Sequence, residues 1–323
     1  MTDDHSSSTG SGRSKRDSGK PLKTRRGAAV SEMRRAALRD NDDDRRAMTK
    51  QDHGKPLSDL DVVILCGGLG TRLREETEFK PKPMVEIGGR PMLWHIMKHY
   101  HQFGVRNFIL CLGYKGDVIR DYFLNYELNN SDVAIDFRDG SLETLSNGYG
   151  EDWRVVLAET GPDTQTGSRI KKALRYVRGN TFLATYGDGL SNVDLNALLA
   201  QHQSSNKLAT VTAVHPSSRF GELAISGDTV SSFREKPQVA DGWINGGFFA
   251  FERRSFDRVN LSDDQPLETG LLESLAADSE LGVYQHDDFW QCMDTVRETQ
   301  LLNEMWASGQ APWQSWDTCR LSA

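Results

Sequence analysis

The stretch Val62-Val-Ile-Leu-Cys-Gly-Gly-Leu-Gly-Thr-Arg-Leu73 joins four consecutive apolar residues to a glycine-rich turn. A short continuous apolar run of this kind is typical of a strand that is buried on both faces of a parallel sheet. The glycines after it leave backbone N–H groups open to a phosphate at the end of that strand. The stretch therefore predicts a buried first strand followed by a candidate phosphate-binding turn.

The glycine spacing in this turn differs from two well-known nucleotide-binding motifs. The dinucleotide fingerprint G-x-G-x-x-G would require glycine at Leu73, and a P-loop would require Gly-Lys followed by Ser or Thr. A Rossmann oxidoreductase is also disfavoured because no acidic residue at the expected distance completes a ribose site. Taken alone, the turn is as well explained by ordinary punctuation between a strand and a helix.

Strand and helix patterns alternate along the rest of the chain. Apolar residues at three- and four-residue steps predict helices over residues 91–103, 118–126 and 170–177. Short apolar runs predict strands over residues 108–112, 155–157 and 181–185, and later ones over 209–214, 221–225, 230–233 and 247–251. This order predicts a Rossmann-like, doubly wound α/β fold with a mixed sheet, whose ligands gather at the carboxyl ends of the strands. A last helix is expected over residues 294–306, with Trp313 and Trp316 anchoring the segment after it.

The composition excludes several classes of protein. A formal net charge of -7 over 323 residues argues against a general nucleic-acid binder, which needs a basic surface. The four cysteines lie far apart with no C-x-x-C pair, so neither a zinc site nor a disulfide framework is predicted, and a reducing cytoplasm is expected. No apolar run approaches the roughly 20 residues that span a bilayer, so no membrane association is expected.

The first 57 residues differ from the rest in composition. They are rich in Ser, Gly, Lys, Arg and Asp and poor in aromatic residues, so they cannot bury enough apolar surface to offset the entropy of ordering. We predict a disordered charged tail over residues 1–57 and one folded domain over residues 58–323. Use of an upstream start codon in place of Met48 is an alternative explanation for this segment.

A basic loop follows the glycine-rich turn. In Lys80-Pro-Lys-Pro-Met84 the two prolines hold their lysines in an extended path that cannot be helical. Together with Arg72, these lysines would place fixed cations beside a triphosphate, whose transfer spreads negative charge over nonbridging oxygens and the leaving pyrophosphate. Taken alone, the loop is as easily a solvated basic turn.

Two acidic residues are candidates for holding a metal ion. Tyr186-Gly-Asp-Gly189 ends the predicted strand 181–185, which puts Asp188 at the carboxyl edge of the sheet between glycines that permit close approach. Mg²⁺ usually takes one or two carboxylates together with substrate phosphates and water, and Asp294 is the candidate for the second. The plainer explanations are a turn at Gly187-Asp188 and a helix N-cap at Asp294.

Together these residues resemble the sugar nucleotidyltransferase family. The pair of elements Gly67-Gly-Leu-Gly-Thr-Arg-Leu73 and Pro81-Lys-Pro-Met84 is highly specific for that family. Within it, the chain is most similar to members that use CTP and glucose-1-phosphate, and the likeness runs from Ser58 to Trp316. It includes the segments 75–77, 80–83, 88–98, 113–116, 160–161, 166–167 with Arg169, 186–189, 219–221, 235–237, 245–249, 289–291 and 293–295.

The resemblance implies a fold of the nucleotide-diphospho-sugar transferase type and a reaction that forms CDP-glucose and pyrophosphate with Mg²⁺. It implies that the nucleotide is wrapped by Leu65, Cys66, Gly67, Gly68, Leu69, Gly70, Thr71 and Arg72. Arg72, Lys82 and Asp188 would be catalytic, with Lys82 on the phosphates, Asp188 and Asp294 on the metal, and Gly187 and Lys236 at the substrates. Thr164 and Arg169 fall where the family extends a loop over the nucleotide, which implies a homo-oligomer such as a hexamer.

The chain departs from the family pattern at a few positions. Cys66 stands where the family usually has Ala, Ser168 where it usually has a second glycine, and Cys292 where Pro is common. These changes leave the charged groups intact. Two other readings remain open: the same chemistry with UTP, dTTP or GTP and another sugar phosphate, and a noncatalytic paralogue that senses sugar nucleotides.

Overall fold

The computed structural model describes residues 55–68, 70, 73–146, 150–216, 222–226, 229–234, 242–259, 261–262 and 264–316. All of them belong to one compact unit, residues 50–323. The predicted tail, residues 1–57, lies outside the described residues except for its last three positions.

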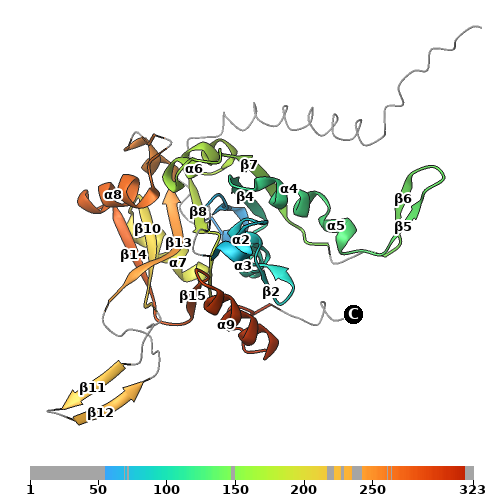
Figure 1. Ribbon diagram of the computed structural model, residues 1–323. Helices are drawn as coiled ribbons and strands as arrows, with labels where there is room; N and C mark the ends of the chain where they lie inside the picture. The colour runs from blue at the N-terminus through green and yellow to red at the C-terminus, as the bar shows by residue number, and fades with distance from the viewer. Residues whose placement is uncertain are drawn as a thin grey trace, which may run out of the picture. The chain divides into compact units, whose positions relative to one another are not determined.

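A seven-stranded mixed sheet forms the centre of this unit, in the order β14-β10-β13-β8-β1-β4-β7 (Figure 1). Strand β1 pairs in parallel with both β4 and β8, whereas β13 runs antiparallel to β8 and β10. The strands are β1 (Asp61–Leu65), β4 (Asn107–Leu112), β7 (Arg154–Glu159), β8 (Thr181–Tyr186), β10 (Ala209–Val214), β13 (Ile244–Glu252) and β14 (Leu281–His286). The predicted mixed α/β sheet is therefore confirmed.

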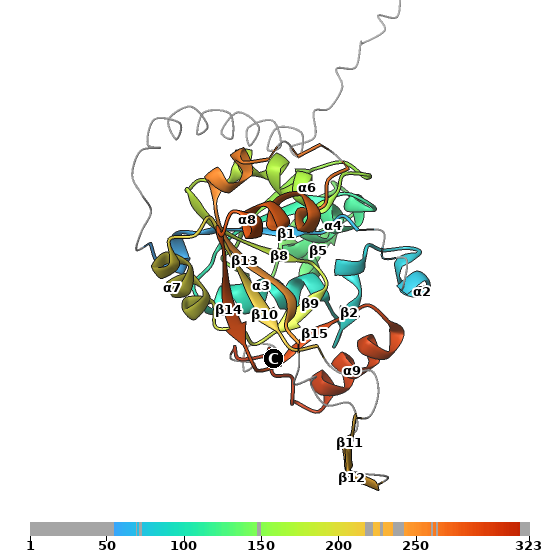
Figure 2. The same ribbon diagram turned by 90° about the vertical axis from the view of Figure 1, so that its left-hand side faces the viewer.

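Helices cover both faces of the sheet because its central strand is apolar on both sides. Val62 and Ile64 belong to a core cluster shared with α3 (Met92–Gln102), α4 (Gly116–Leu124), α7 (Leu195–Ser205) and α9 (Val296–Ala307). Val63 and Leu65 belong to a second cluster with α6 (Thr166–Ala173), the π-helix η7 (Glu268–Leu272) and α8 (Glu273–Ala277). Figure 2 shows α6 and α8 on one side of the strands and α3 on the other.

The smaller elements are short helices and two-stranded sheets. The helices are η2 (Leu57–Asp59), α2 (Arg74–Thr77), η4 (Lys82–Met84), α5 (Tyr126–Asn129), η5 (Leu174–Tyr176) and η6 (Arg253–Asp257). The strand pairs are β2 (Glu86–Ile87) with β3 (Arg90–Pro91), β5 (Val133–Asp136) with β6 (Ser141–Thr144), β9 (Gly189–Ser191) with β15 (Trp290–Cys292), and β11 (Glu222–Ser226) with β12 (Thr229–Arg234). Within the described part of the chain, no helix is long and apolar enough to cross a membrane.

The observed elements agree with the predicted ones except at their ends and in a few omissions. The predicted helix 118–126 ends at Leu124 in α4, and the predicted helix 170–177 begins four residues earlier, at Thr166 in α6. The sequence analysis missed α7, η7 with α8, the edge strand β14 of the main sheet, and the β5–β6 hairpin, besides shorter elements. It also placed Leu57 in the tail, but this side chain is 3% exposed and packs in the core, because the turn η2 directs it inward.

The segment after α9 closes over α3, as its tryptophans predicted. Trp313 is fully buried, and its Nε1 donates a hydrogen bond to Nδ1 of His95 at 3.3 Å. Nε2 of His95 lies 2.8 Å from the carbonyl oxygen of Ile87 and donates to it in this arrangement. Both ring nitrogens are therefore satisfied by neutral imidazole, and burial lowers the pKa of His95 to about 4.

This buried imidazole predicts a stability that depends on pH. The unfolded chain binds a proton at His95 below about pH 6.5, whereas the folded chain resists protonation until about pH 4. The free energy of unfolding should therefore fall with acidification across that window, with His95 contributing up to about 1 kcal/mol per pH unit. Urea unfolding at several pH values measures this slope. His95→Gln keeps a donor and an acceptor without the charge, so its slope should be shallower, and an equal slope would contradict the assignment.

Candidate active site

A cavity of about 570 Å³ lies at the carboxyl ends of β1 and β8, the edge at which the sequence predicted ligand binding. Its walls come from four segments: the glycine-rich turn after β1, the loop that leads into α6, the residues of η4, and the end of β8. The lining residues are Leu65, Gly67, Gly68, Gly70, Lys82, Pro83, Pro162, Asp163, Thr164, Gln165, Thr166, Arg169, Tyr186, Gly187 and Asp188.

Glycine is required where these segments meet. A Cβ atom on Gly187 would lie 2.5 Å from the carbonyl oxygen of Leu65 and 2.8 Å from Cγ of Pro83. Gly70 has a φ of +60°, the left-handed region in which side chains are strained. The two strand ends and the Lys82-Pro83 segment can therefore approach one another only because these positions lack side chains.

Arg169 joins the loops of the cavity from beneath. Its guanidinium donates to the carbonyl oxygens of Leu112, Gly161, Gly67 and Pro162 at 2.8 to 3.1 Å, and to Oγ1 of Thr160 at 2.7 Å. A Cβ on Gly67 would lie 2.2 Å from Cζ of Arg169, so the glycine-rich turn rests directly on the guanidinium. Burial lowers the pKa of Arg169 from its ordinary value. No described carboxylate makes a salt bridge with the guanidinium. Its positive charge is therefore stabilised mostly by the partial negative charges of backbone carbonyl oxygens.

Thr164 and Arg169 were predicted, from the family resemblance, to contact the nucleotide. Both side chains line the cavity, and they are 7% and 4% exposed. Thr164 Oγ1 donates to the carbonyl oxygen of Thr160 at 2.7 Å and accepts from Nζ of Lys172 at 3.0 Å. The hydrogen bonds of both residues thus stabilise the loop itself, and direct contact with a nucleotide stays a prediction.

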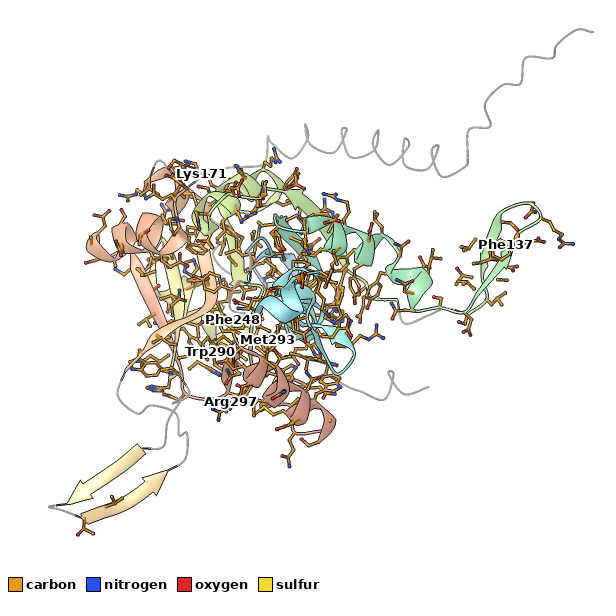
Figure 3. The ribbon with its side chains drawn as sticks, in the orientation of Figure 1. Phe137, Lys171, Phe248, Trp290, Met293 and Arg297 are labelled. Atoms are coloured by element: carbon orange, nitrogen blue, oxygen red, sulfur yellow. The ribbon has the colours of Figure 1, made fainter. Side chains whose placement is uncertain are left out.

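Two strands bring Asp188 and Asp294 together from distant parts of the chain. The antiparallel pair β9–β15 aligns Cys292 with Gly189, and the amide of Met293 donates to the carbonyl oxygen of Asp188 at 2.9 Å. Met293 is fully buried in the same core cluster as Phe248, with Trp290 packed against it (Figure 3). This anchor fixes Asp294 at the cavity edge.

The alternative reading of Asp294 as a helix N-cap is wrong. Thr295 is the N-cap of α9: its side chain accepts from the amide of Glu298, and the Glu298 carboxylate accepts from the amide of Thr295, which completes a capping box. The side chain of Asp294 therefore does not cap α9, and it accepts a hydrogen bond from Lys82.

Lys82 lies between the two carboxylates. Its ammonium donates to Oδ2 of Asp188 at 2.7 Å and also to Oδ1 of Asp294. Burial disfavours the charged form, but the two carboxylates outweigh it and raise the pKa of Lys82 above its ordinary value. The ammonium is thus held in its charged form.

The carboxylate pair fits a hard divalent cation. Both Asp188 and Asp294 contact the same ammonium, so their oxygens converge on one point that already holds positive charge. No group of three or more His, Cys, Asp and Glu residues that could hold a metal occurs in the described ranges. The protein would therefore supply two oxygen ligands and leave the other positions to substrate and water, which is the usual arrangement for Mg²⁺.

Several residues that the sequence predicted for the site either lie outside the described residues or have side chains that do not face the cavity. Leu69, Thr71, Arg72 and Lys236 lie outside the described residues. The Cys66 side chain is fully buried in the core, and its thiol approaches the carbonyl oxygen of Ile64 at 3.6 Å, so only the backbone of Cys66 can face the cavity. Burial raises the pKa of this thiol well above its ordinary value.

The sequence analysis missed a polar network at the other wall of the cavity. The hydroxyl of Tyr186 donates to Glu268 and accepts from Nδ2 of Asn245 at 3.1 Å. Thr166 Oγ1 donates to Oε2 of the same glutamate at 3.2 Å. Tyr186 belongs to the quoted Tyr-Gly-Asp-Gly segment, but Glu268 lies 82 residues from it in the chain, and no local pattern marks it.

Comparison with known proteins places these features in a family. A family model described as nucleotidyl transferase matches residues 61–297. The chain is 46% identical over 259 residues to glucose-1-phosphate cytidylyltransferase of Salmonella typhi, covering 80% of this chain and 100% of the relative. It is 44% identical over 257 residues to the probable glucose-1-phosphate cytidylyltransferase of Bacillus subtilis, with the same coverage.

More distant relatives share the fold. The chain is 30% identical over 249 residues to mannose-1-phosphate guanylyltransferase of Mycobacterium tuberculosis, covering 74% of this chain and 62% of that one. The crystal structure of HddC from Yersinia pseudotuberculosis complexed with GMP-PN is 25% identical, with a TM-score of 0.54 over 76% of this chain and 99% of that one.

The position of Arg169 predicts a large structural cost for its removal. Arg169→Met would leave several buried carbonyl groups without a donor, so we expect a loss of at least about 2 kcal/mol in the free energy of unfolding. Arg175→Met removes an exposed arginine from the same region, which contacts the ring of Tyr176, and should change the free energy of unfolding by less than about 1 kcal/mol. Urea unfolding measures both variants. Equal stability of the two would show that Arg169 does not hold the loops together.

Proposed function

The chain belongs to the nucleotidyl transferase family, and on that basis we propose that it transfers the cytidylyl group from CTP to glucose-1-phosphate, giving CDP-glucose and pyrophosphate. The observation that carries the proposal is the cluster of Lys82, Asp188 and Asp294 beside a glycine-rich turn at the carboxyl edge of the sheet. Cations and metal-binding carboxylates at a phosphate cradle are what transfer from a nucleoside triphosphate requires.

The choice of CTP rests on the pattern of similarity. The match to the Salmonella cytidylyltransferase covers that whole protein at 46% identity, whereas the mannose-1-phosphate guanylyltransferase matches at 30% and is spanned only in part. A noncatalytic sensor of sugar nucleotides is disfavoured because both acids and Lys82 are present and converge.

In the proposed complex, the glycine-rich turn 65–72 receives the triphosphate through backbone N–H groups. Lys82 and Arg72 neutralise the charge that develops on the leaving pyrophosphate, and Gly187 admits the substrate close to the end of β8. Asp188 and Asp294 hold Mg²⁺, which when bound supplies further charge neutralisation at the phosphates. Lys236 binds the phosphate of the sugar, a role that rests on the family resemblance alone.

The reaction is an in-line displacement at phosphorus. A phosphate oxygen of glucose-1-phosphate attacks the α-phosphorus of CTP, the bond from that phosphorus to the bridging oxygen breaks, and pyrophosphate leaves with the electron pair. The attacking phosphate is already an anion near neutral pH, so no protein nucleophile is needed. The nearby thiols are unsuited to that role, because burial raises the pKa of Cys292 to about 12 and that of Cys66 well above its ordinary value.

We also propose that the protein is a homo-oligomer, and the β5–β6 hairpin supports this. Phe137 at the hairpin is 91% exposed, and Ile135, Leu142 and Leu145 are 52%, 47% and 62% exposed (Figure 3). An isolated two-stranded hairpin with exposed apolar residues is marginal in water unless something covers it. A second copy of this chain would cover it, in an assembly such as a hexamer.

A shallow apolar cavity offers the receiving surface on that second copy. It has a volume of about 550 Å³ and lies against α4, α5 and the edge strand β7, with Leu124, Tyr126, Trp153, Val155 and Leu157 in its lining. A cytoplasmic location is the remaining part of the proposal, which rests on the phosphorylated substrates and on the buried free thiols of Cys66 and Cys111.

The substrate assignment predicts a preference for one nucleotide. With Mg²⁺ and glucose-1-phosphate, we expect pyrophosphate release from CTP to exceed that from UTP, dTTP, GTP and ATP by at least tenfold in kcat/KM, which is about 1.4 kcal/mol of discrimination. A coupled pyrophosphate assay measures it.

Asp188→Asn removes a charge without changing the size of the side chain. It should reduce kcat by at least about a hundredfold, in line with losing a main electrostatic contact. Preference for another nucleotide would keep the chemistry and reject CTP, whereas full activity of Asp188→Asn would reject the site.

The hairpin predicts a loss of assembly on a single substitution. Phe137→Asp places a charge on the proposed interface and should shift the protein toward the monomer in sedimentation velocity. Arg138→Ala, at the neighbouring exposed position, should leave the sedimentation coefficient unchanged. A wild-type protein that sediments as a monomer would reject the oligomer.

A further inference from the structure

The ammonium of Lys82 occupies the point on which the two acidic side chains converge. It donates to Oδ2 of Asp188 at 2.7 Å and to Oδ1 of Asp294, and the lysine side chain is only 12% exposed. These are charge-assisted hydrogen bonds, which are stronger than neutral ones. The strongest contacts that the structure gives Lys82 are therefore to carboxylates.

The same two carboxylates are the metal ligands in the proposed function. An ammonium and a divalent cation cannot both sit between one pair of carboxylate oxygens, because the two cations repel and claim the same lone pairs. A metal bound between these two oxygens must therefore break at least one contact of Lys82.

The surroundings of Lys82 allow its head group to leave while its backbone stays in place. Pro81 and Pro83 flank it, both are buried, and the amide of Val85 donates to the carbonyl oxygen of Lys82 at 3.1 Å. The Cβ of Lys82 lies 3.4 Å from the position that a Cβ on Gly70 would take, and Lys82 lines the same cavity as the glycine-rich turn. Rotation of the side chain alone can therefore carry the ammonium from the carboxylates toward the phosphate cradle.

We propose that Lys82 is an internal competitor of the divalent metal: it occupies the metal position in the free protein, and the metal displaces it into the nucleotide cavity. This inference rests on the proposed function, since it takes Asp188 and Asp294 as the metal ligands. It assigns Lys82 a second task beyond neutralising phosphate charge. The free protein holds its two acids together without a metal, and the ammonium becomes available to a triphosphate only when the metal has arrived.

Two consequences follow for the order of events. The metal binds weakly to the free protein because it must displace an ammonium, and it binds more tightly when a triphosphate accepts that ammonium. The nucleotide, in turn, loses a cationic contact when the metal is absent. Metal and nucleotide binding are thereby coupled through one side chain, and such coupling is reciprocal.

The test measures Mn²⁺ binding to the full-length protein without nucleotide, by the electron paramagnetic resonance signal of free Mn²⁺. Mn²⁺ stands in for Mg²⁺ because both prefer oxygen ligands. Lys82→Met keeps the length of the side chain and removes the competing charge, so we expect its Mn²⁺ dissociation constant to fall at least tenfold relative to wild type. Lys80→Met removes the same charge two residues away, where the lysine contacts Glu86 at 3.6 Å, and should change the constant by less than twofold.

The outcomes separate this proposal from the metal site itself. Asp294→Asn should weaken Mn²⁺ binding both in the wild-type background and in Lys82→Met. If Asp294→Asn has no effect in either, the metal assignment fails and the competition fails with it. If Asp294→Asn weakens binding but Lys82→Met binds Mn²⁺ no more tightly than wild type, the metal site stands and the competitor role is overturned.

A second measurement follows the unsubstituted protein, in case Lys82→Met does not fold. Reductive methylation with ¹³C-formaldehyde labels lysines while keeping their charge, and the Lys82 signal is assigned by its loss in Lys82→Arg, which keeps the charge at this position. Titration with Mg²⁺ and no nucleotide should shift this signal with the same midpoint as metal binding. A Lys82 signal that does not move while Mg²⁺ binds would overturn the proposal.

Discussion

The buried guanidinium of Arg169 is the contact on which the cavity depends. A charge removed from water must be compensated, and here carbonyl oxygens at the ends of β1, β4 and β7 supply most of the compensation. The requirement for glycine follows from it, because the guanidinium occupies the space that a side chain on Gly67 or Gly113 would need. Arg169 thus holds three loops from different parts of the chain at fixed distances from one another. The glycine-rich turn can present its backbone to a phosphate because the guanidinium lies directly beneath it.

The acidic pair depends on a different constraint, the pairing of β9 with β15. Two carboxylates at one point repel, so their approach must be stabilised by contacts elsewhere and by a cation between them. Burial of Met293 and its hydrogen bond to the backbone of Asp188 supply the first, and Lys82 supplies the second. Because Asp188 and Asp294 lie far apart in the chain, this arrangement forms only once the sheet and the segment before α9 have packed together, which couples the metal site to completion of the fold.

Local sequence patterns predicted the sheet and part of the site. They failed for contacts between residues that are far apart in the chain. Val62 to Leu65 predicted a two-faced buried strand because apolar continuity is a local property, and Asp188 was placed correctly at a strand end because a motif follows the strand directly. The apolar spacing of Leu195, Leu198 and Leu199 also indicates a helix, so α7 could have been predicted from the sequence. By contrast, Glu268 contacts Tyr186 only because distant segments meet. The capping box of Thr295 and Glu298 is local, so the Thr-x-x-Glu spacing could have placed the start of α9 after Asp294. Arg169 was predicted from resemblance to contact a ligand, whereas its hydrogen bonds to the protein could be found only in three dimensions.

Among the described residues that line the cavity, the two cations Arg169 and Lys82 differ in the way that their chemistry requires. Arg169 presents five donors in a rigid plane, and its bonds to four carbonyl oxygens and a hydroxyl leave it no partner to exchange without breaking the loops. Lys82 is a point charge on a flexible stem, bound to side chains that can accept another cation in its place. Exchanging the two residues would therefore defeat both tasks: a lysine at 169 could not reach five acceptors, and an arginine at 82 would be held too firmly by two carboxylates to give way. A fixed cation beneath the phosphate cradle and an exchangeable one beside it are what a site needs if it must be rigid toward the nucleotide and responsive toward the metal.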